Sequence, residues 1–207
     1  MDAPVYIFAD ESCLGNQFTD RASPGGAAAL LEYWRDGAWT RRDVWICEPA
    51  TTNNRMAIRS AIEPLRLLRR PCTVEFSSDS QYLVKGIREW VPGWIRRGWK
   101  RRSGAVENED LWRDLVEAAT PHRVEWRWVR GHAGHPQNEY ANYLATRAAK
   151  KQEPSEGLQP SGFEAWLEKE REKGRYMEFY EFAPPRDALE APPPIRRREQ
   201  DGTAPPG

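Results

Sequence analysis

The chain has 207 residues, with 31 basic and 31 acidic side chains and a formal net charge of zero. This length allows one domain of ordinary size plus an appendage, and no stretch is long and apolar enough to span a bilayer. Cys13, Cys47 and Cys72 are odd in number and widely spaced, which indicates neither a disulfide framework nor a zinc site. We therefore expect an unsecreted, cytoplasmic protein without a membrane partner.

The zero net charge hides an uneven distribution. Residues 152–207 carry 12 acidic and 8 basic side chains, so the rest of the chain is mildly basic. Within that body, residues 85–102 hold seven basic residues against one acidic residue, with three tryptophans among them. Such a basic and aromatic segment suits a phosphate backbone, and the alternative is a solvated helix face.

The first strong element is the apolar run from Val5 to Ala9, which ends on Asp10. A run without polar alternation predicts a buried strand in a sheet that helices cover on at least one face. A carboxylate at the end of such a strand either meets a cation or caps the following turn. Both interpretations stay open on this stretch alone.

The later elements are predicted from periodicity and breaker residues. A helix is expected from the cap-type residues 51–54 to Arg70, with a kink or an early end near Glu63, because Pro64 removes a backbone hydrogen bond. The remaining strands are expected at residues 27–34, 43–47, 72–77 and 124–129, and the remaining helices at 82–99, 111–119 and 136–150.

The composition changes at Gln152. Residues 152–157 predict a linker, residues 163–182 a short helix followed by an alternating aromatic and acidic stretch, and residues 183–207 a disordered, proline-rich tail. We therefore divide the chain into a domain of residues 1–151 and an extension of residues 152–207. The aromatic stretch is expected to add an edge strand or to bind a protein partner, the tail to be dispensable for folding, and the chain to be a monomer.

The element order, with Asp10 and Asp79 each at the end of an apolar run, resembles that of type 1 ribonuclease H. Residues 93–100 are similar to the basic protrusion of that family. The resemblance covers residues 4–150 and implies an α/β fold with a five-stranded mixed sheet flanked by helices. Four segments carry it: Asp10 with residues 12–16, residues 51–56 (TTNNRM), residues 78–82 (SDSQY) and residues 131–139 (GHAGHPQNE).

The resemblance implies hydrolysis of the RNA strand of an RNA/DNA hybrid by two Mg²⁺ ions held by four carboxylates, with Mn²⁺ as a substitute. It assigns metal ligation to Asp10 and Asp79, and proton transfer or product departure to His132, whereas His135 is expected to be structural. It assigns hybrid binding to Cys13, Asn16, Thr52, Asn53, Asn54, Gln81, Trp90, Trp94, Arg96, Arg97, Trp99 and Lys100.

The sequence departs from the family pattern at two of the four carboxylates. Ala57 stands where the family has a glutamate, and Asn142 stands where it has an aspartate. Asn142 keeps an oxygen that could bind a metal, and Glu11 stands where the family usually has glycine. Because successive strand residues point to opposite faces, Glu11 is expected to help only if its strand has already ended.

Three hypotheses follow from these departures. The chain is an active or weakly active ribonuclease H in which Glu11, Glu139 or water replaces the lost ligands; or it is a catalytically dead module that still binds hybrids; or the two substitutions were engineered to trap a complex. A scaffold for the extension ranks last. With two motif carboxylates left, we expect at most one divalent ion to bind without substrate, and cleavage to be slow.

Overall fold

The computed structural model describes residues 4–15, 23–101, 104–131 and 135–179. Its centre is a mixed sheet whose strands are β1 (Val5–Cys13), β2 (Ser23–Arg35), β3 (Ala38–Thr51), β4 (Thr73–Ser78), β7 (Arg123–Trp128) and β8 (Gln159–Pro160). The strand order is β7-β4-β1-β2-β3-β8. The predicted α/β fold with five principal strands is confirmed, and the short β8 adds a sixth strand from the extension.

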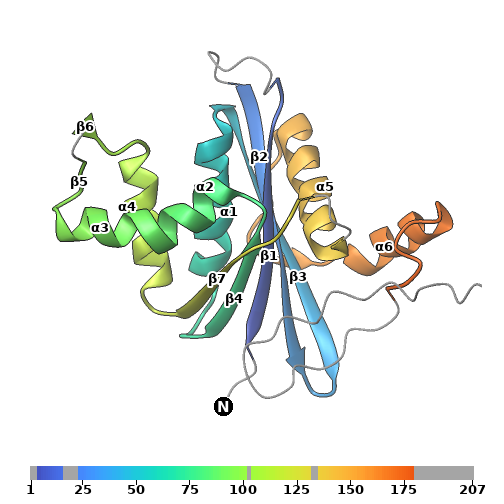
Figure 1. Cartoon of the computed structure of the whole chain (residues 1–207). Coiled ribbons are helices and arrows are strands. Elements are labelled where there is room, and N and C mark those ends of the chain that lie inside the picture. Colours follow the sequence, from blue (N-terminus) through green and yellow to red (C-terminus); the bar gives the residue numbers. More distant parts are fainter. Residues whose placement is uncertain (1–3, 16–22, 102–103, 132–134, 180–207) are drawn as a thin grey trace, which may run out of the picture.

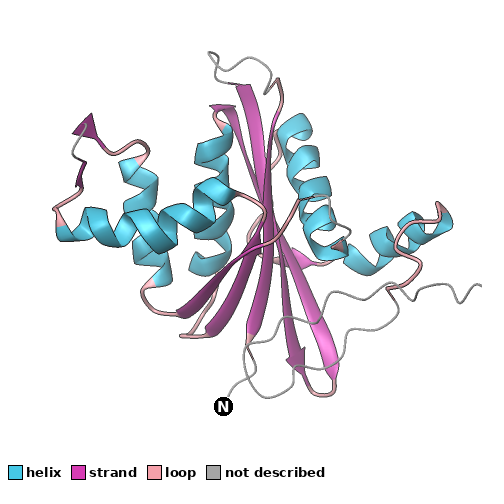
Figure 2. Cartoon of the chain, in the orientation of Figure 1, coloured by secondary structure: helices cyan, strands magenta, loops and turns pink. Residues whose placement is uncertain are grey.

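Helices cover both faces of this sheet (Figures 1 and 2). The helix α1 (Asn53–Arg66) and the shorter α4 (Glu109–Ala119) lie on one face, and α5 (Pro136–Lys151) lies on the other. Alternate strand residues therefore serve two cores. Ile7 and Ala9 pack in the core that contains α1, whereas Ala28 and Leu30 pack against α5.

The helix α1 continues past the predicted stop at Glu63 and ends at Arg66, four residues before the predicted limit at Arg70. Pro64 lacks the N–H that would bond the Ser60 carbonyl, but this loss falls in the last turn. Leu65 is fully buried in the core, so apolar packing holds that turn in the helix. The helix thus ends before Arg70 but three residues beyond Glu63, and the alternative expectation of a kink there stays a prediction.

The basic segment predicted as one helix forms three short helical pieces, α2 (Gln81–Lys85), the π-helical turn η1 (Gly86–Trp90) and α3 (Val91–Arg96). With the following turn and β5 (Lys100–Arg101), which pairs with β6 (Gly104–Ala105), these residues form a protrusion that we call the handle. A Cβ on Gly86 would lie 2.2 Å from the Trp112 ring, so the glycine lets this buried indole pack directly against the backbone.

The extension packs on the sheet up to the end of α6 (Phe163–Glu172). Strand β8 pairs with β3, and the Trp45 and Ser155 backbones are hydrogen bonded at 2.9 Å. The predicted helix in residues 163–182 is thus present as α6. Among residues 176–179 no strand forms, and residues 180–207 lie outside the described part of the chain. The division at residue 151 stays a prediction.

A buried polar cluster anchors this extension. The Asp43 carboxylate is 2% exposed and accepts hydrogen bonds from the Tyr140 hydroxyl at 2.6 Å and from the Gly162 backbone N–H at 3.0 Å. The fully buried ring of Phe163 packs edge-on against Tyr140. Three separate parts of the chain, β3, α5 and the extension, therefore meet at one carboxylate.

None of the helices in the described ranges has the length and apolar character needed to cross a membrane.

Replacing Phe163 with alanine is expected to lower the free energy of unfolding by about 3–5 kcal/mol, because the ring is fully buried and the site cannot collapse around a smaller side chain. Urea unfolding followed by tryptophan fluorescence measures this loss. Met177→Ala is the control, since that side chain is 48% exposed, and its effect should stay within about 0.5 kcal/mol. Equal stabilities of the two variants would show that α6 does not contribute to the fold.

Candidate active site

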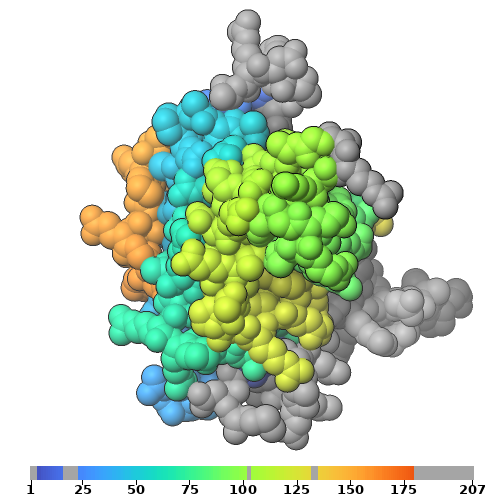
Figure 3. Space-filling model, turned by 90° about the vertical axis from the view of Figure 1, so that its left-hand side faces the viewer, coloured from blue at the N-terminus to red at the C-terminus, as the bar shows by residue number. Residues whose placement is uncertain are grey.

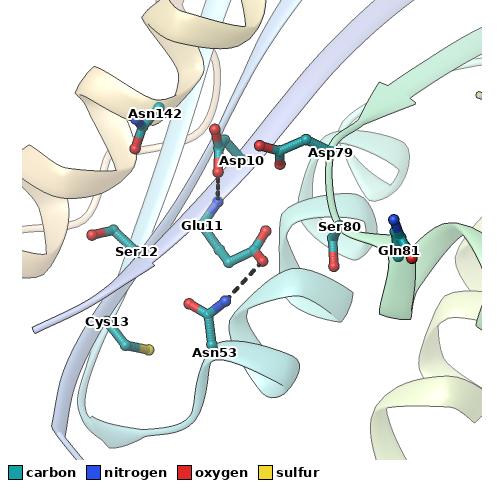
Figure 4. A pocket seen from close by; sticks show the side chains of 9 residues that line it. All are labelled: Asp10, Glu11, Ser12, Cys13, Asn53, Asp79, Ser80, Gln81 and Asn142. Carbon is teal, nitrogen blue, oxygen red and sulfur yellow. Dashed lines mark hydrogen bonds between the residues drawn. The ribbon is translucent and has the colours of Figure 1, made fainter. Parts of the chain in front are cut away.

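The candidate site lies where β1 and β4 run side by side. These strands are parallel, and their last paired residues are Ala9 and Ser78. Asp10 and Asp79 follow directly, so the two carboxylates emerge at the same end of the sheet. Carboxylate oxygens of Asp10, Glu11 and Asp79 all lie within 4.8 Å of one another (Figure 4). The prediction that Asp10 and Asp79 lie within a few ångströms of each other is confirmed. The expectation that Asp10 ends its strand is wrong, because β1 continues to Cys13 and Asp10 is paired with Ala28 of β2.

Glu11 joins this cluster although its strand has not ended. Strand β1 continues to Cys13, and Glu11 is paired with Ala27 of β2. Its side chain leaves from the face covered by α1, whereas Asp10 points towards α5, which contributes a hydrogen bond from Asn138. The expectation that Asp10 and Glu11 leave opposite faces of the strand is confirmed. The expectation that Glu11 helps only if its strand has ended stays a prediction, although its carboxylate joins the cluster from within the strand. Beyond Ser78 the neighbouring strand β4 has ended, so the longer glutamate side chain reaches the cluster around the open edge of β1.

Hydrogen bonds fix the two neighbouring carboxylates differently. Asp10 Oδ1 accepts a bond from the Glu11 backbone N–H at 2.7 Å, and Oδ2 accepts a longer one from Asn138 Nδ2 at 3.4 Å. Glu11 Oε1 accepts a bond from Asn53 Nδ2 at 3.1 Å. Glu11 Oε2 is buried and has no hydrogen-bond partner among the described residues. One oxygen of Glu11 is thus anchored and the other is left for a ligand.

Asp79 is held between strand β7 and the loop that follows it. The Trp128 indole N–H donates to the Asp79 backbone carbonyl at 3.0 Å. A Cβ on Gly131 would lie 2.3 Å from Asp79 Oδ2, so only glycine allows the backbone to approach the carboxylate this closely. The loop expected to carry His132 therefore begins at the acidic cluster. His132 itself, like Asn16, lies outside the described residues.

The electrostatics of the cluster favour a cation. Burial, and then the neighbouring Asp79, raise the pKa of Asp10 to about 8. Burial and the charges of Asp10 and Asp79 raise the pKa of Glu11 well above its usual value. Grouped carboxylates with raised pKa values and one unpaired buried oxygen fit a hard divalent cation, whose charge would offset their mutual repulsion and lost hydration.

The two positions with lost carboxylates lie on α1 and α5, the helices that pack against β1 from its two sides. Ala57 is fully buried on α1, one turn after Asn53. Asn142 on α5 lines the pocket one turn after Asn138, and its Oδ1 accepts a weak bond from Thr146 Oγ1 at 3.4 Å. An amide oxygen thus remains near the carboxylates at position 142, whereas position 57 offers no ligand atom.

The pocket around the cluster includes part of the predicted hybrid-binding set. Its lining residues are Asp10, Glu11, Ser12, Cys13, Asn53, Asp79, Ser80, Gln81 and Asn142. Sequence analysis assigned no role to Ser12 and Ser80, although both lie within segments that carry the resemblance. Thr52 and Asn54 flank Asn53 at the start of α1, and the Thr52 side chain caps that helix by accepting a bond from the Arg55 N–H.

Some of the predicted binding residues of the handle are buried inside it, and others are exposed on its surface. Trp94 is 9% exposed and packs against Trp112, and Trp99 lies under the Arg113 guanidinium. Trp90 is 37% exposed. The rings of Trp94 and Trp99 therefore stabilise the handle from within, and Trp90 and the basic side chains form its exposed surface. Those exposed basic side chains are Arg96, Arg97 and Lys100. Figure 3 views the molecule from the side on which the handle lies, and the handle (green) and α4 (yellow-green) cover much of the surface seen there.

An α/β sheet with clustered carboxylates at adjacent strand ends defines a class of protein suited to metal-assisted chemistry at phosphate groups. The chain belongs to the ribonuclease H family, because the family model described as RNase H matches residues 2–150. In general, this family hydrolyses the RNA of RNA/DNA hybrids with divalent metal ions.

Curated relatives agree with this assignment. Ribonuclease HI of Caulobacter vibrioides is 46% identical over 155 residues, which cover 74% of this chain and 98% of the relative. A ribonuclease H of Aromatoleum aromaticum is 50% identical over 148 residues, or 71% of this chain and 91% of the relative.

Solved structures show the same fold. The crystal structure of LC9-RNase H1, described as a type 1 RNase H with the type 2 active-site motif, is 54% identical with a TM-score of 0.75, covering 81% of this chain and 82% of that one. The solution structure of the PFV RNase H domain has a TM-score of 0.61 at 16% identity over 72% of this chain and 96% of that one. The second likeness concerns the fold alone.

Replacing Asp10 with asparagine is expected to stabilise the metal-free protein near pH 8 more than near pH 5. The pKa of Asp10 rises from 3.8 to about 8 on folding, so the folded chain holds this proton more tightly than the unfolded chain does. The stability that comes from this bound proton is fully present below pH 3.8 and is lost as the pH rises through 8. Urea unfolding in EDTA at several pH values measures the effect.

Asp110→Asn is the matched control for this experiment. A hydrogen bond from Arg55 lowers the pKa of Asp110, so that carboxylate stabilises the fold when ionised, and its replacement should destabilise the protein at pH 7 rather than stabilise it. A destabilising effect of Asp10→Asn at pH 8 in EDTA would contradict the electrostatic description of the cluster.

Proposed function

We propose that this chain is an active ribonuclease H that hydrolyses the RNA strand of RNA/DNA hybrids with Mg²⁺ or Mn²⁺, and that Glu11 replaces the glutamate absent at Ala57. The observation that carries the proposal is the meeting of the Glu11, Asp10 and Asp79 carboxylates within 4.8 Å. Holding three carboxylates together costs free energy unless a cation binds there, and an inert module would gain nothing from this arrangement.

The position of Glu11 supports the replacement. Asn53 and Ala57 lie one turn apart on α1, and Glu11 projects from β1 towards Asn53. A glutamate at position 57 would project from the helix towards the same region. Glu11 thus supplies its carboxylate from the strand instead of the helix, and the small side chain of Ala57 leaves that region to it. The description of LC9-RNase H1, which distinguishes its motif from that of other type 1 enzymes, is consistent with such a variant site.

In this proposal Asp10, Glu11 and Asp79 hold the cations, and Asn142 offers a neutral oxygen. Bound divalent ions supply charge stabilisation to the attacking and leaving oxygens of an in-line displacement at phosphate. The set carries one negative charge fewer than four carboxylates, so cations bind more weakly to the free protein and substrate phosphate completes the ligand set. His132, from the adjoining loop, assists proton transfer or product departure.

The hybrid is held by two surfaces in this proposal. Cys13, Asn53 and Gln81 line the pocket and place the scissile strand over the carboxylates. The handle supplies exposed positive charge from Arg96, Arg97 and Lys100, which attracts the phosphate backbone without reading its sequence.

A second candidate function is hybrid binding without cleavage. It rests on Ala57 and Asn142, which remove two of the four family carboxylates. Under this hypothesis the chain does not cleave, Glu11 has no catalytic role, and the handle and the pocket residues Cys13, Asn53 and Gln81 only bind the hybrid. The natural or engineered origin of the two substitutions does not alter this alternative, because both origins predict an intact binding surface and no cleavage.

Glu11→Gln is expected to slow cleavage of a labelled RNA/DNA hybrid by about 100-fold or more, since losing a carboxylate ligand removes charge stabilisation worth several kcal/mol. Adding Ala57→Glu to the Glu11→Gln variant should restore much of the rate, because the carboxylate then enters from α1. Initial rates in Mg²⁺ and in Mn²⁺ measure both effects.

The exposed Glu117→Gln is the control for these variants and should cleave like the unaltered chain. Full activity of Glu11→Gln would remove Glu11 from the reaction. If the unaltered chain is inert with both ions but cleaves after Ala57→Glu and Asn142→Asp are combined, the binding-only function is correct.

Neutralising Arg96, Arg97 and Lys100 is expected to flatten the dependence of log hybrid affinity on log salt concentration. Each lost phosphate contact reduces the slope by roughly 0.7–0.9, because fewer counterions are released on binding. Anisotropy titrations in EDTA at several salt concentrations measure the slope. The control neutralises Arg35, Lys150 and Lys151, which are exposed elsewhere on the surface. An unchanged slope in the handle variant would place hybrid binding on another face.

A further inference from the structure

Glu11 needs an anchor that a helical glutamate would not need. Its side chain starts on the α1 face of the sheet and reaches the cluster around the edge of β1, next to Asp10 and Asp79, which carry the same charge. A glutamate has several rotatable bonds, and holding it in one arrangement costs conformational entropy. Repulsion from the neighbouring carboxylates opposes the same arrangement.

Asn53 supplies that anchor. Its Nδ2 donates to Glu11 Oε1 at 3.1 Å, and no other side-chain donor to this carboxylate is found among the described residues. The other oxygen, Oε2, is buried and unpaired, so the single bond leaves one oxygen for a cation. Figure 4 shows the Asn53 amide below Glu11, on the side away from Asp10 and Asp79.

The backbone that carries Asn53 is well anchored. Asn53 is the first residue of α1, and Thr52 closes the first turn by accepting bonds from the Arg55 and Met56 backbone N–H groups. Met56 and Ile58 are fully buried, which ties this turn to the sheet. The backbone from which the Asn53 side chain starts is therefore held in place by contacts that do not involve the pocket.

We propose that Asn53 is a positioning residue for Glu11, holding its carboxylate so that Oε2 faces Asp10 and Asp79 and binds a divalent cation with them. This inference rests on the proposed function, because it takes Glu11 as a ligand. It gives Asn53 a task separate from contact with the hybrid, and that task exists in the protein without nucleic acid.

Cation affinity of the free protein is the decisive measurement. Asn53→Ala is expected to weaken Mn²⁺ binding by 10- to 100-fold in calorimetric titrations without nucleic acid, the usual cost of losing a residue that orients a metal ligand. Glu117→Gln is the control, since that side chain is exposed on α4, and its Mn²⁺ affinity should equal that of the unaltered chain. If Asn53 served hybrid contact alone, Mn²⁺ affinity would be equal in both variants and the inference would fail.

A double-mutant cycle with Glu11→Gln separates this inference from the proposed function. If Asn53 acts through Glu11, Asn53→Ala adds no further loss of Mn²⁺ affinity in the Glu11→Gln background. Independent, additive losses would show that Asn53 acts on another ligand and would overturn the inference alone. Unchanged Mn²⁺ binding in Glu11→Gln would overturn the proposed function together with it. No Mn²⁺ binding by the unaltered chain would overturn the inference alone, because substrate phosphate can still complete the ligand set.

Thermal unfolding in EDTA checks that the variants are folded. Alanine is well tolerated at a first helical position, and the Thr52 cap is retained, so Asn53→Ala should melt within a few degrees of the unaltered chain. Asn53→Gln, which keeps an amide donor on a longer side chain, is a second variant and should bind Mn²⁺ better than Asn53→Ala. The reverse order would contradict a role for the amide donor.

Discussion

The site depends on one constraint, the parallel pairing of β1 and β4 and the place where that pairing stops. The last pair is Ala9 with Ser78, and the next residue of each strand is an aspartate. Parallel strands bring equivalent ends to the same edge, so the sheet itself forces two like charges together. The same early end of β4 opens the edge of β1 and allows Glu11 to reach the cluster from the opposite face.

Under the proposed function, a metal ligand comes from a different element of the fold and still serves the same site. In the family pattern the glutamate belongs to the helix at the position of Ala57, whereas here the carboxylate comes from the strand beneath that helix. The two arrangements differ in how the side chain is ordered. A helical glutamate inherits a narrow set of rotamers, while Glu11 relies on its bond to Asn53. If Glu11 replaces the helical glutamate, the order of the carboxylate therefore depends on the first turn of α1, which carries Asn53.

The sequence predicted most of the fold because its strands and helices are strongly periodic, and it located Asp10 and Asp79 because each ends an apolar run. It could not predict the π-helical turn at Gly86, since that turn depends on the Trp112 ring from a helix far along the chain. It did not predict that the Glu11 carboxylate would join the cluster from within its strand, because strand alternation describes directions and says nothing about where the neighbouring strand stops. The buried contacts of Asp43 with the extension were equally invisible, as they join three distant segments.

The short pairing of β8 with β3 has a consequence for association between molecules. A long outer strand such as β3 presents unpaired backbone groups, to which a second chain can add by strand addition. Here Gln159 and Pro160 pair with Asp43 and Arg42, and the backbone N–H and hydroxyl of Ser155 both donate hydrogen bonds to the Trp45 carbonyl. Pro160 offers no N–H to a further strand. The extension thus covers part of the open border of the sheet with a segment that is itself a poor template for aggregation.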